Sequence, residues 1–444
     1  MNASGAPSSE SLERDASQIN ARHGKIDANE IAVGVILGRT SEFFDFFVYA
    51  IASVVVFPAL VFPYAGALGG TLLSFAVFAV AFAARPIGTA LFIAIDRKYG
   101  RGTKLTIALL LLGLSTVCMG FIPSYATAGH WAAVMLIVLR IAQGIALGGT
   151  WDGMPSLLAV SAPENRKGWY AMIPQLGAPL GLIVASALFA YFIAKLTPQD
   201  FFAWGWRYPF FVAFAINVVA LFARLRIVVS PTFQAAFHTS ELQPSPIGQT
   251  IKEEGPSILV GTFAPLATFA MIHMVTVYPL SWVFLYTEDN VARFLVIQLI
   301  AAAIGVASVI ASGVLADRFG RRKLLGATSV GIGIFALAAT PLLDGGSMGE
   351  TAYLVIGYIL LGLAFGQASG VIAQNFAQRN RYTASAITSD LAWLFGAGFA
   401  PLAALWLSSQ FGLWAGGAYL LSGTIVTLLV LRWNRSLAAR INAN

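Results

Sequence analysis

The chain has 444 residues, of which 58% are hydrophobic and only 11% are charged, whereas soluble domains are roughly 45 to 50% apolar and 25% charged. This composition excludes an ordinary soluble domain and indicates a protein embedded in a membrane. The net charge of +7 is carried mainly by connections between apolar segments, so it indicates membrane topology and no nucleic-acid partner.

The N-terminal segment, residues 1–29, is polar and is expected to form a flexible cytoplasmic tail. It lacks the short apolar core, basic start and small-residue cleavage site of a signal peptide. Apolar stretches then recur from about residue 30 to residue 433. A helix needs about 20 residues to cross a bilayer core near 30 Å thick. The stretches show no alternation of apolar and polar residues, so they predict membrane-spanning helices with internally bonded backbones.

Breaks at glycine, proline and charged clusters divide the chain into twelve apolar segments. We expect an all-α membrane protein with spans at about 30–60, 66–94, 103–122, 130–161, 168–196, 207–228, 257–286, 292–315, 323–343, 350–376, 384–408 and 412–432.

Lysine and arginine are concentrated in the connections after even-numbered segments, with Lys195, Arg207 and Arg293 as the exceptions. The cations counted after even segments are Arg97, Lys98, Arg101, Lys104, Arg166, Lys167, Arg224, Arg226, Arg318, Arg321, Arg322, Lys323, Arg379, Arg381, Arg432, Arg435 and Arg440. Because cytoplasmic loops carry the excess of Lys and Arg, both termini are expected in the cytoplasm.

A long polar stretch divides the spans into six and six, which suggests a parallel repeat. IDRKYGRG follows the second span and LADRFGRRK follows the eighth, about 220 residues later, which supports two related halves with a site between them. The expected organisation is a tail at 1–29, a first half at 30–228, a cytoplasmic linker at 229–256, a second half at 257–433 and a tail at 434–444.

Three charges, Arg39, Glu42 and Asp45, fall inside the first expected span. An ionisable residue near the bilayer centre costs roughly 2.5 to 3.5 kcal/mol, so these side chains should face the protein interior. Together with Tyr49 they fall within about 120° of a helical wheel, which is one face of the helix. That face is either an internal set of ion pairs or the site of a protonatable carboxylate, for which Asp45 is the deeper candidate.

Two arginines lie inside other spans of the first half. Arg85 is about eleven residues from the loop, roughly 16 Å deep at 1.5 Å per residue, and is expected to pair with Asp45 or Glu42. Arg140 is followed by Gln143. A guanidinium group does not release its proton usefully, so Arg140 can hold a carboxylate or influence a neighbouring acid but cannot carry the proton.

In the second half, His273 and Asp390 are the ionisable residues well inside expected spans. His273 is either a hydrogen-bonded packing residue or an imidazole that binds substrate or senses pH. Asp390 either lines a cavity or closes the cytoplasmic side. The sequence has no P-loop, paired cysteines, H-E-x-x-H or G-x-S-x-G motif, so we expect no enzymatic activity and no cofactor. If the chain moves a substrate across the membrane, the energy would come from an ion gradient or from the substrate's own gradient.

Two motifs carry a family resemblance. GVLADRFGRRK, residues 313–323, matches the loop signature G-x-x-x-D-R-x-G-R-R, and RIAQGIALGG, residues 140–149, matches R-x-x-Q-G. Both are signatures of the major facilitator superfamily, which this chain resembles. Within that superfamily it is similar to the metabolite:proton symporters, in stretches such as GRTSEFFDFFVYA, AARPIGTALF, PQLGAPLGLIVAS and GWRYPFF that occur in the same order.

The chain departs from the subfamily pattern after the fourth-span motif. Thr150 stands where the subfamily typically has glutamate, and Asp152 replaces a glycine. Two residues along a helix correspond to a rotation of about 200°, so Asp152 cannot serve the same face as the missing glutamate. The first loop, DRKYGRG, is also one residue longer between its Asp and Gly than the signature.

The resemblance implies twelve transmembrane helices in two pseudo-symmetric six-helix halves and proton-coupled uptake of a small mono-, di- or tricarboxylate by alternating access. It also covers zwitterionic solutes and cyclic polyol acids. It further implies a bacterial inner-membrane protein that works as a monomer with substrate, protons and the lipid bilayer as its partners. Two alternatives stay open, namely an exporter of amphipathic compounds and a non-transporting membrane sensor.

The candidate residues fall into three groups. For proton coupling they are Asp45, Glu42 and Arg140. For substrate binding they are Arg39, Arg140, Gln143, His273 and Tyr49. For structural pairing or gating they are Arg85, Asp96, Arg97, Arg101, Asp317, Arg318, Arg321, Asp152 and Asp390.

Overall fold

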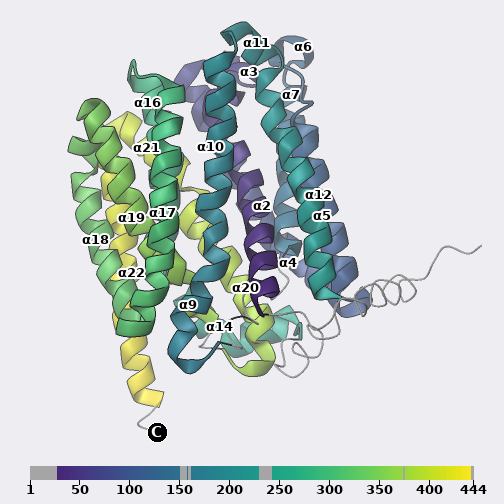
Figure 1. Cartoon of the computed structure of the whole chain (residues 1–444), viewed down its shortest axis with the longest axis vertical. Coiled ribbons are helices and arrows are strands. Elements are labelled where there is room, and N and C mark those ends of the chain that lie inside the picture. Colours follow the sequence, from purple (N-terminus) through teal and green to yellow (C-terminus); the bar gives the residue numbers. More distant parts are fainter. Residues whose placement is uncertain (1–27, 151–157, 159–161, 230–242, 374–375, 442–444) are drawn as a thin grey trace, which may run out of the picture.

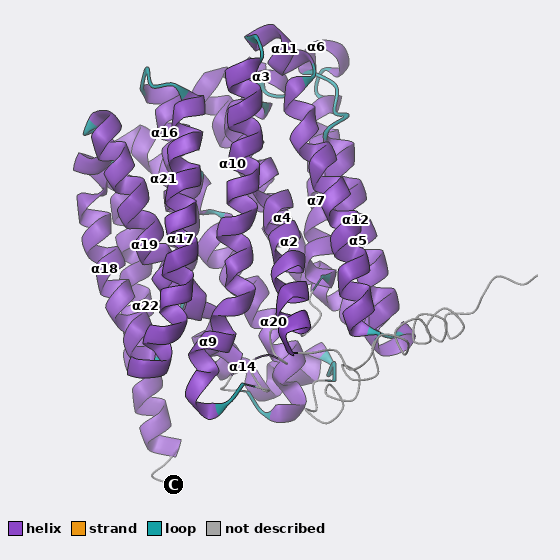
Figure 2. Cartoon of the chain, viewed as in Figure 1, coloured by secondary structure: helices purple, strands orange, loops and turns teal. Residues whose placement is uncertain are grey.

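The computed structural model of the chain describes residues 28–150, 158, 162–229, 243–373 and 376–441. These residues form helices joined by short loops, with no strand among them (Figure 2). The long helices run side by side along one common direction and build a single bundle (Figure 1). The expected all-α class is confirmed.

The first half contains long helices and short helical turns between them. They are α2 (Ala28–Val55), α3 (Phe57–Leu60), η1 (Pro63–Ala65), α4 (Gly66–Tyr99), α5 (Arg101–Met119), α6 (Tyr125–Ala128), α7 (Trp131–Gly149), η2 (Glu164–Arg166), α9 (Lys167–Met172), η3 (Ile173–Leu176), α10 (Gly177–Lys195), α11 (Pro198–Ala203), η4 (Gly205–Arg207) and α12 (Tyr208–Val228).

The second half has the same character, with its long segments broken more often. Its helices are α14 (Ile247–Phe263), α15 (Leu266–Thr276), α16 (Tyr278–Tyr286), α17 (Val291–Phe319), α18 (Arg321–Leu343), α19 (Gly346–Ala373), η5 (Gln378–Asn380), α20 (Arg381–Ala392), η6 (Trp393–Gly398), α21 (Ala400–Phe411) and α22 (Trp414–Ile441). The helix α14 begins ten residues before the expected seventh span, inside the stretch predicted to be a linker.

Eleven helical segments in the described part of the chain are long and apolar enough to cross a membrane. The helix α2 has 28 residues and lies within the same bundle (Figure 1). It is too charged to meet that criterion because it carries Arg39, Glu42 and Asp45. With α2 the bundle has the twelve spans that the sequence predicts.

Prolines interrupt two of the spans. The seventh is divided into α14, α15 and α16 at Pro265 and Pro279, since proline provides no N–H for the helical ladder. The fifth is divided into α9, η3 and α10, with Pro174 at the break. The eleventh contains a π-helical turn, η6, which includes Gly396 and Gly398, a form that often marks functional sites.

Glycine allows α7 to pack directly on the backbone of α4. A Cβ atom at Gly144 would lie 2.3 Å from the carbonyl oxygen of Ala81, and one at Gly148 would lie 2.4 Å from that of Arg85. Neither approach is possible with a larger residue, so these glycines fix α7 against α4. Arg140 lies one turn before Gly144 and is positioned by the same contact.

The two halves meet along two pairs of neighbouring spans. The helix α10 packs on α17, and α4 packs on α20, η6 and α21. Aromatic rings fill the space between the halves, with Phe43 of α2 5.8 Å from Trp393 and Phe46 5.3 Å from His273, measured between ring centroids. The apolar core is therefore continuous across both halves.

Candidate functional site

Asp45 lies in the middle of α2 and is 1% exposed. Its Oδ2 atom accepts a hydrogen bond of 2.5 Å from Asn217 of α12 and one of 3.2 Å from the Thr116 hydroxyl of α5. Its Oδ1 atom has no hydrogen-bond partner among the described residues. A buried carboxyl group with one bonded and one unbonded oxygen is suited to accept a proton on the unbonded atom.

Glu42, one turn before Asp45, has a different environment. It pairs with Arg39 at 2.7 Å and also with Arg224 of α12. Arg224 donates a second bond, of 2.9 Å, to the backbone carbonyl of Thr150. Glu42 thus lies between two cations. This arrangement corresponds to the first of the two alternatives given for this helix face, an internal set of ion pairs. Counting Arg224 as a loop cation was wrong, because it is buried within α12.

The predicted partner of Arg85 was also wrong. Arg85 pairs with Asp390 of α20, with Nε and Oδ1 2.7 Å apart, and not with Asp45 or Glu42. The reason is the direction of the side chain, since this face of α4 packs against the eleventh span. Thr89 donates a hydrogen bond to the other oxygen of Asp390. The guanidinium group of Arg85 also lies 5.9 Å from the ring centre of Trp393.

Arg140 is buried, with 1% of its surface exposed. Its hydrogen-bond acceptors are both neutral, the side-chain oxygen of Gln143 and, at 2.9 Å, the backbone carbonyl of Phe78. The guanidinium group lies over the ring of Tyr49, 3.8 Å from its centre. Its Nε atom and the Tyr49 hydroxyl have no hydrogen-bond partner in the described part of the chain. Arg140 is therefore a buried cation without a carboxylate partner among the described residues.

Gln143 connects Arg140 to Asp45. Its oxygen accepts from Arg140, and its nitrogen donates a bond of 2.9 Å to the Thr116 hydroxyl. Thr116 in turn donates to Asp45. The three bonds form a continuous chain of donors that runs from the guanidinium group to the carboxylate.

His273 of α15 is a residue of the second half that lies next to this group of side chains. Its ring stacks on Phe46 and meets Phe78 edge-on, with centroids 5.1 Å apart in the second contact. Its Nδ1 atom lies 3.4 Å from the Thr276 hydroxyl, and its Nε2 atom has no hydrogen-bond partner among the described residues. Phe78 is in contact with both Arg140 and His273, so one aromatic ring separates the two candidate substrate-binding groups.

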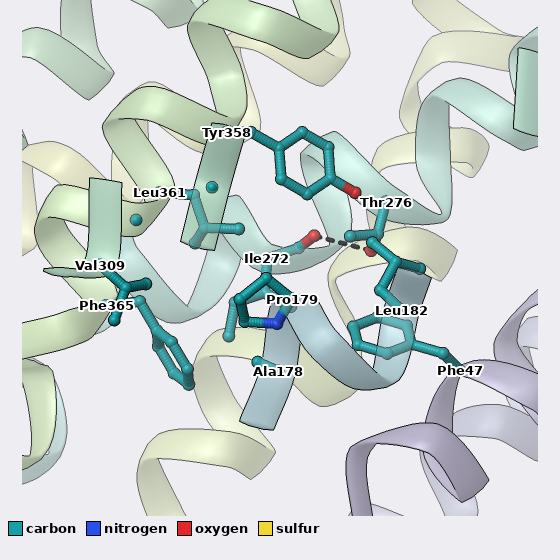
Figure 3. Close-up of a pocket in the computed structure, with 12 residues that line it drawn as sticks. Phe47, Ala178, Pro179, Leu182, Ile272, Thr276, Val309, Tyr358, Leu361 and Phe365 are labelled. Carbon is teal, nitrogen blue, oxygen red and sulfur yellow. Dashed lines mark hydrogen bonds between the residues drawn. The ribbon is translucent and has the colours of Figure 1, made fainter. Parts of the chain in front are cut away.

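A small cavity lies where five spans of both halves meet (Figure 3). Its walls include Phe47, Pro179, Ile272, Val309 and Tyr358. The volume that the centre of a water molecule can occupy in it is about 20 Å³, which is room for about one water. This cavity is therefore too small for a metabolite.

The second loop motif joins the halves at one end of the bundle. Asp317 accepts hydrogen bonds from the backbone N–H groups of Gly168, at 2.5 Å, and Trp169, at 3.1 Å. Arg321 donates to the backbone carbonyl of Lys167. Both contacts connect the eighth-to-ninth loop with the start of the fifth span, at the lower end of Figure 1 where α9 is labelled. We call this end of the bundle the Asp317 end.

The first loop motif, which belongs to the first half, contacts the second half in turn. Asp96 accepts a bond of 3.1 Å from the hydroxyl of Tyr382 in α20 and pairs with Lys104 at 3.4 Å and with Arg101 at 3.8 Å. Lys104, counted as a loop cation, is buried in α5.

Three gating predictions gain no support from the geometry. Arg97 and Arg318 are exposed, and neither forms an ion pair or hydrogen bond with the opposite half among the described residues, so their assignment to the gate stays a prediction. Asp152 lies outside the described residues.

Sequence reasoning missed Thr116, Asn217 and the buried position of Arg224. A polar signal existed, since Asn217 is an uncharged polar residue inside an otherwise apolar span. Thr116 gave no such signal, because threonine is common in membrane helices and bonds its own backbone there.

Comparisons with known proteins agree with this architecture. A model of the Major Facilitator Superfamily matches residues 43–401. An inner membrane metabolite transport protein of Escherichia coli K12, YhjE, is 36% identical over 428 residues, which cover 94% of this chain and 95% of that protein. The shikimate transporter of the same organism is 28% identical, over 90% of this chain and 93% of its own length.

Among solved structures, a D-xylose-proton symporter has the same fold. The TM-score is 0.70, with 18% sequence identity over 90% of this chain and 96% of that chain. At this identity the likeness concerns the fold alone.

Proposed function

The chain belongs to the Major Facilitator Superfamily, and from this premise we propose that it takes up a small organic anion together with protons by alternating access. That it is a membrane transporter of metabolites, and not an enzyme, follows from the family and from relatives of nearly full length. The proposal adds a carboxylate substrate, a proton as the coupled ion, and the residues that bind each of them.

The observation that carries the proposal is the environment of Arg140. A buried guanidinium group whose described acceptors are both neutral leaves a positive charge uncompensated in a medium of low dielectric constant. A substrate carboxylate can compensate that charge with two parallel hydrogen bonds, which matches the forked geometry of arginine. Arg39 is less suited to this role because it already pairs with Glu42.

The second half would contribute His273. Its unbonded Nε2 atom and its position across Phe78 from Arg140 support a role in binding a second polar group of the substrate. A hydroxy acid, with a carboxylate at one end and hydroxyl groups at the other, has this arrangement of groups. The shikimate transporter among the relatives supports this class of substrate.

Asp45 is proposed to carry the proton. One of its oxygens has no described hydrogen-bond partner, whereas Glu42 forms ion pairs with two arginines. Protonation of Asp45 would break no ion pair in the described chain, but protonation of Glu42 would weaken two. The energy source is then the proton gradient, with no cofactor.

Alternating access would require the contacts at the Asp317 end to break. Those made by Asp317, Asp96 and Asp390 all connect the two halves. We propose that this end faces the cytoplasm with both chain termini, as the loop cations predict, and that one chain is the working unit.

The test is transport by the purified protein in liposomes. An imposed inward proton gradient is expected to drive accumulation of at least one radiolabelled compound from a panel of shikimate, quinate, succinate, citrate and glycine betaine. Addition of a protonophore should abolish the accumulation, and liposomes without protein serve as the control. Loss of compound only from preloaded vesicles would favour an exporter, and binding without flux would favour a sensor; either result contradicts the proposal.

A further inference from the structure

We propose that Thr116 is a coupling residue, whose hydroxyl group transmits the state of the substrate-binding arginine to the proton-binding carboxylate. This inference rests on the proposed function, in which Arg140 binds the anion and Asp45 the proton. It assigns a positioning role to a residue on α5, a span that supplies no other residue between Arg140 and Asp45.

The geometry places Thr116 between two groups that do not bond each other directly. Its Oγ1 atom lies 2.9 Å from the nitrogen of Gln143 and 3.2 Å from Oδ2 of Asp45. A hydroxyl group has one proton and two lone pairs, so it can accept from the amide and donate to the carboxylate at the same time. All members of the chain from Arg140 to Asp45 are buried to at least 99%.

Few charged or titratable groups surround the hydrogen-bonded series from Arg140 to Asp45. On α2, Glu42 is paired with Arg39 and, across the helix contact, with Arg224. Tyr49 lies under Arg140. On α4, Arg85 pairs with Asp390 and not with Asp45. In the described chain, the hydrogen-bonded route into Asp45 from a cation therefore passes through Thr116, while Asn217 provides a neutral donor.

The hydrogen bonds from Arg140 to Asp45 all donate in the same direction. As a result, binding of the substrate anion and binding of the proton should favour each other, as a symporter requires. With Arg140 bonded to Gln143, the amide is polarised and Thr116 donates well to an ionised Asp45, because linked hydrogen bonds strengthen one another. A substrate carboxylate that takes the guanidinium group displaces the oxygen of Gln143. The donor to Asp45 then weakens, and Asp45 binds a proton more readily. By linkage, a proton on Asp45 strengthens substrate binding by the same factor.

The alternative is that Thr116 is a local donor to Asp45 and that Gln143 has no influence beyond Arg140. The two explanations differ in a double-mutant cycle, because only a relay makes the effect of Gln143 depend on Thr116. Thr116→Val removes the hydroxyl at nearly constant volume, so the helix packing is retained. Thr116→Ser keeps the hydroxyl and should restore the behaviour of the unaltered chain.

The test follows proton binding to Asp45 in the purified full-length protein without substrate. The readout is the infrared C=O band of the protonated carboxyl group that Asp45→Asn removes, titrated against pH. Four proteins are compared, namely the unaltered chain, Thr116→Val, Gln143→Leu and the double variant. We expect Thr116→Val to move the midpoint by about one pH unit to higher pH, since the ionised form loses a donor.

Gln143→Leu is expected to move the midpoint in the same direction when Thr116 is present and not at all when Thr116→Val is already in place. Ser115→Ala is the matched control, because that neighbouring hydroxyl donates to the carbonyl of Leu112 in its own helix, and it should leave the midpoint unchanged. An equal effect of Gln143→Leu in both backgrounds, or in neither, would overturn the relay.

The outcome is separable from that of the proposed function. Proton-driven uptake by the unaltered chain together with an additive cycle would overturn the relay alone. A non-additive cycle without proton-driven uptake would overturn the proposed function, and with it the coupling role of Thr116.

Discussion

Arg85 and Asp390 form an ion pair that joins the two halves of the bundle, with Nε and Oδ1 2.7 Å apart and both side chains nearly buried. The two residues are about 300 positions apart in the sequence, and each would be costly in the membrane interior alone. Because they lie on different halves, the pair exists only while α4 and α20 are together. It links the closed state of the Asp317 end to the electrostatics of the interior.

Asp390→Asn is expected to lower the thermal stability of the purified protein. Removal of one partner leaves the other charge buried, which costs about 3 to 5 kcal/mol in known cases. Glu253→Gln is the matched control, because the Glu253–Arg379 pair is equally short but exposed and should change the melting temperature little. Equal melting temperatures for the two variants would show that the Arg85–Asp390 pair does not hold the halves together.

Asp45→Asn is expected to abolish proton-driven accumulation while exchange of substrate between the two sides continues. Asparagine retains the size of the side chain and a carbonyl that accepts from Asn217 and Thr116, but it cannot bind a proton. The measurement compares uptake under a proton gradient with counterflow in preloaded liposomes. Unchanged accumulation by the variant would remove Asp45 from the coupling role.

Arg140→Lys is expected to raise the apparent substrate constant about tenfold or more. Lysine keeps the charge but loses the forked pair of donors, and a loss of about 1.4 kcal/mol corresponds to a factor of ten. Arg293→Lys serves as the control, because Arg293 is partly exposed at the other end of the bundle. A constant that does not change in Arg140→Lys would make Arg140 a structural residue.

His273→Phe is expected to leave the folded protein intact and to change the order of preference among carboxylates. A phenyl ring can occupy the position between Phe46 and Phe78, since both contacts are aromatic. It removes the nitrogen that we propose for the second polar group of the substrate. The check is competition by unlabelled shikimate and succinate, and an unaltered ratio of their inhibition would assign His273 to packing.

Gly144→Ala is expected to destabilise the protein or prevent its folding. The added Cβ would meet the backbone of Ala81, and backbone cannot move aside as a flexible side chain can. Overpacking of this kind costs about 1 to 3 kcal/mol or more. Gly248→Ala has open space around its Cβ position and should be tolerated, as size-exclusion profiles and melting temperatures of the two variants would show.

Much of the fold followed from local properties of the sequence. The length of the apolar segments predicts spans because the bilayer thickness is fixed, and the composition predicts helices because a membrane provides no other hydrogen-bond partners. The polar face of α2 was predictable for the same reason, since Arg39, Glu42 and Asp45 recur with helical spacing. These inferences need only the neighbours along the chain.

The pairing of charges could not be obtained in this way. Arg85 was assigned to Asp45 or Glu42, but it pairs with Asp390, and Glu42 pairs with Arg224, which the sequence suggested to be a loop cation. Depth within a span limits which groups share a level but does not say which face of a helix meets which neighbour. That choice depends on how each helix is rotated about its axis and on how closely neighbouring helices approach, as Gly144 permits for α7 and α4.

Sequence alone therefore determined which residues are too polar to face lipid, because the cost of burying a charge depends on the residue and the solvent. The tertiary structure decided how each charge is compensated, because compensation depends on distances of a few ångströms between helices that are far apart in the chain. It left Arg140 with neutral acceptors and brought Thr116 between Gln143 and Asp45. Both features arise where the four helices α2, α4, α5 and α7 meet, and no single segment encodes them.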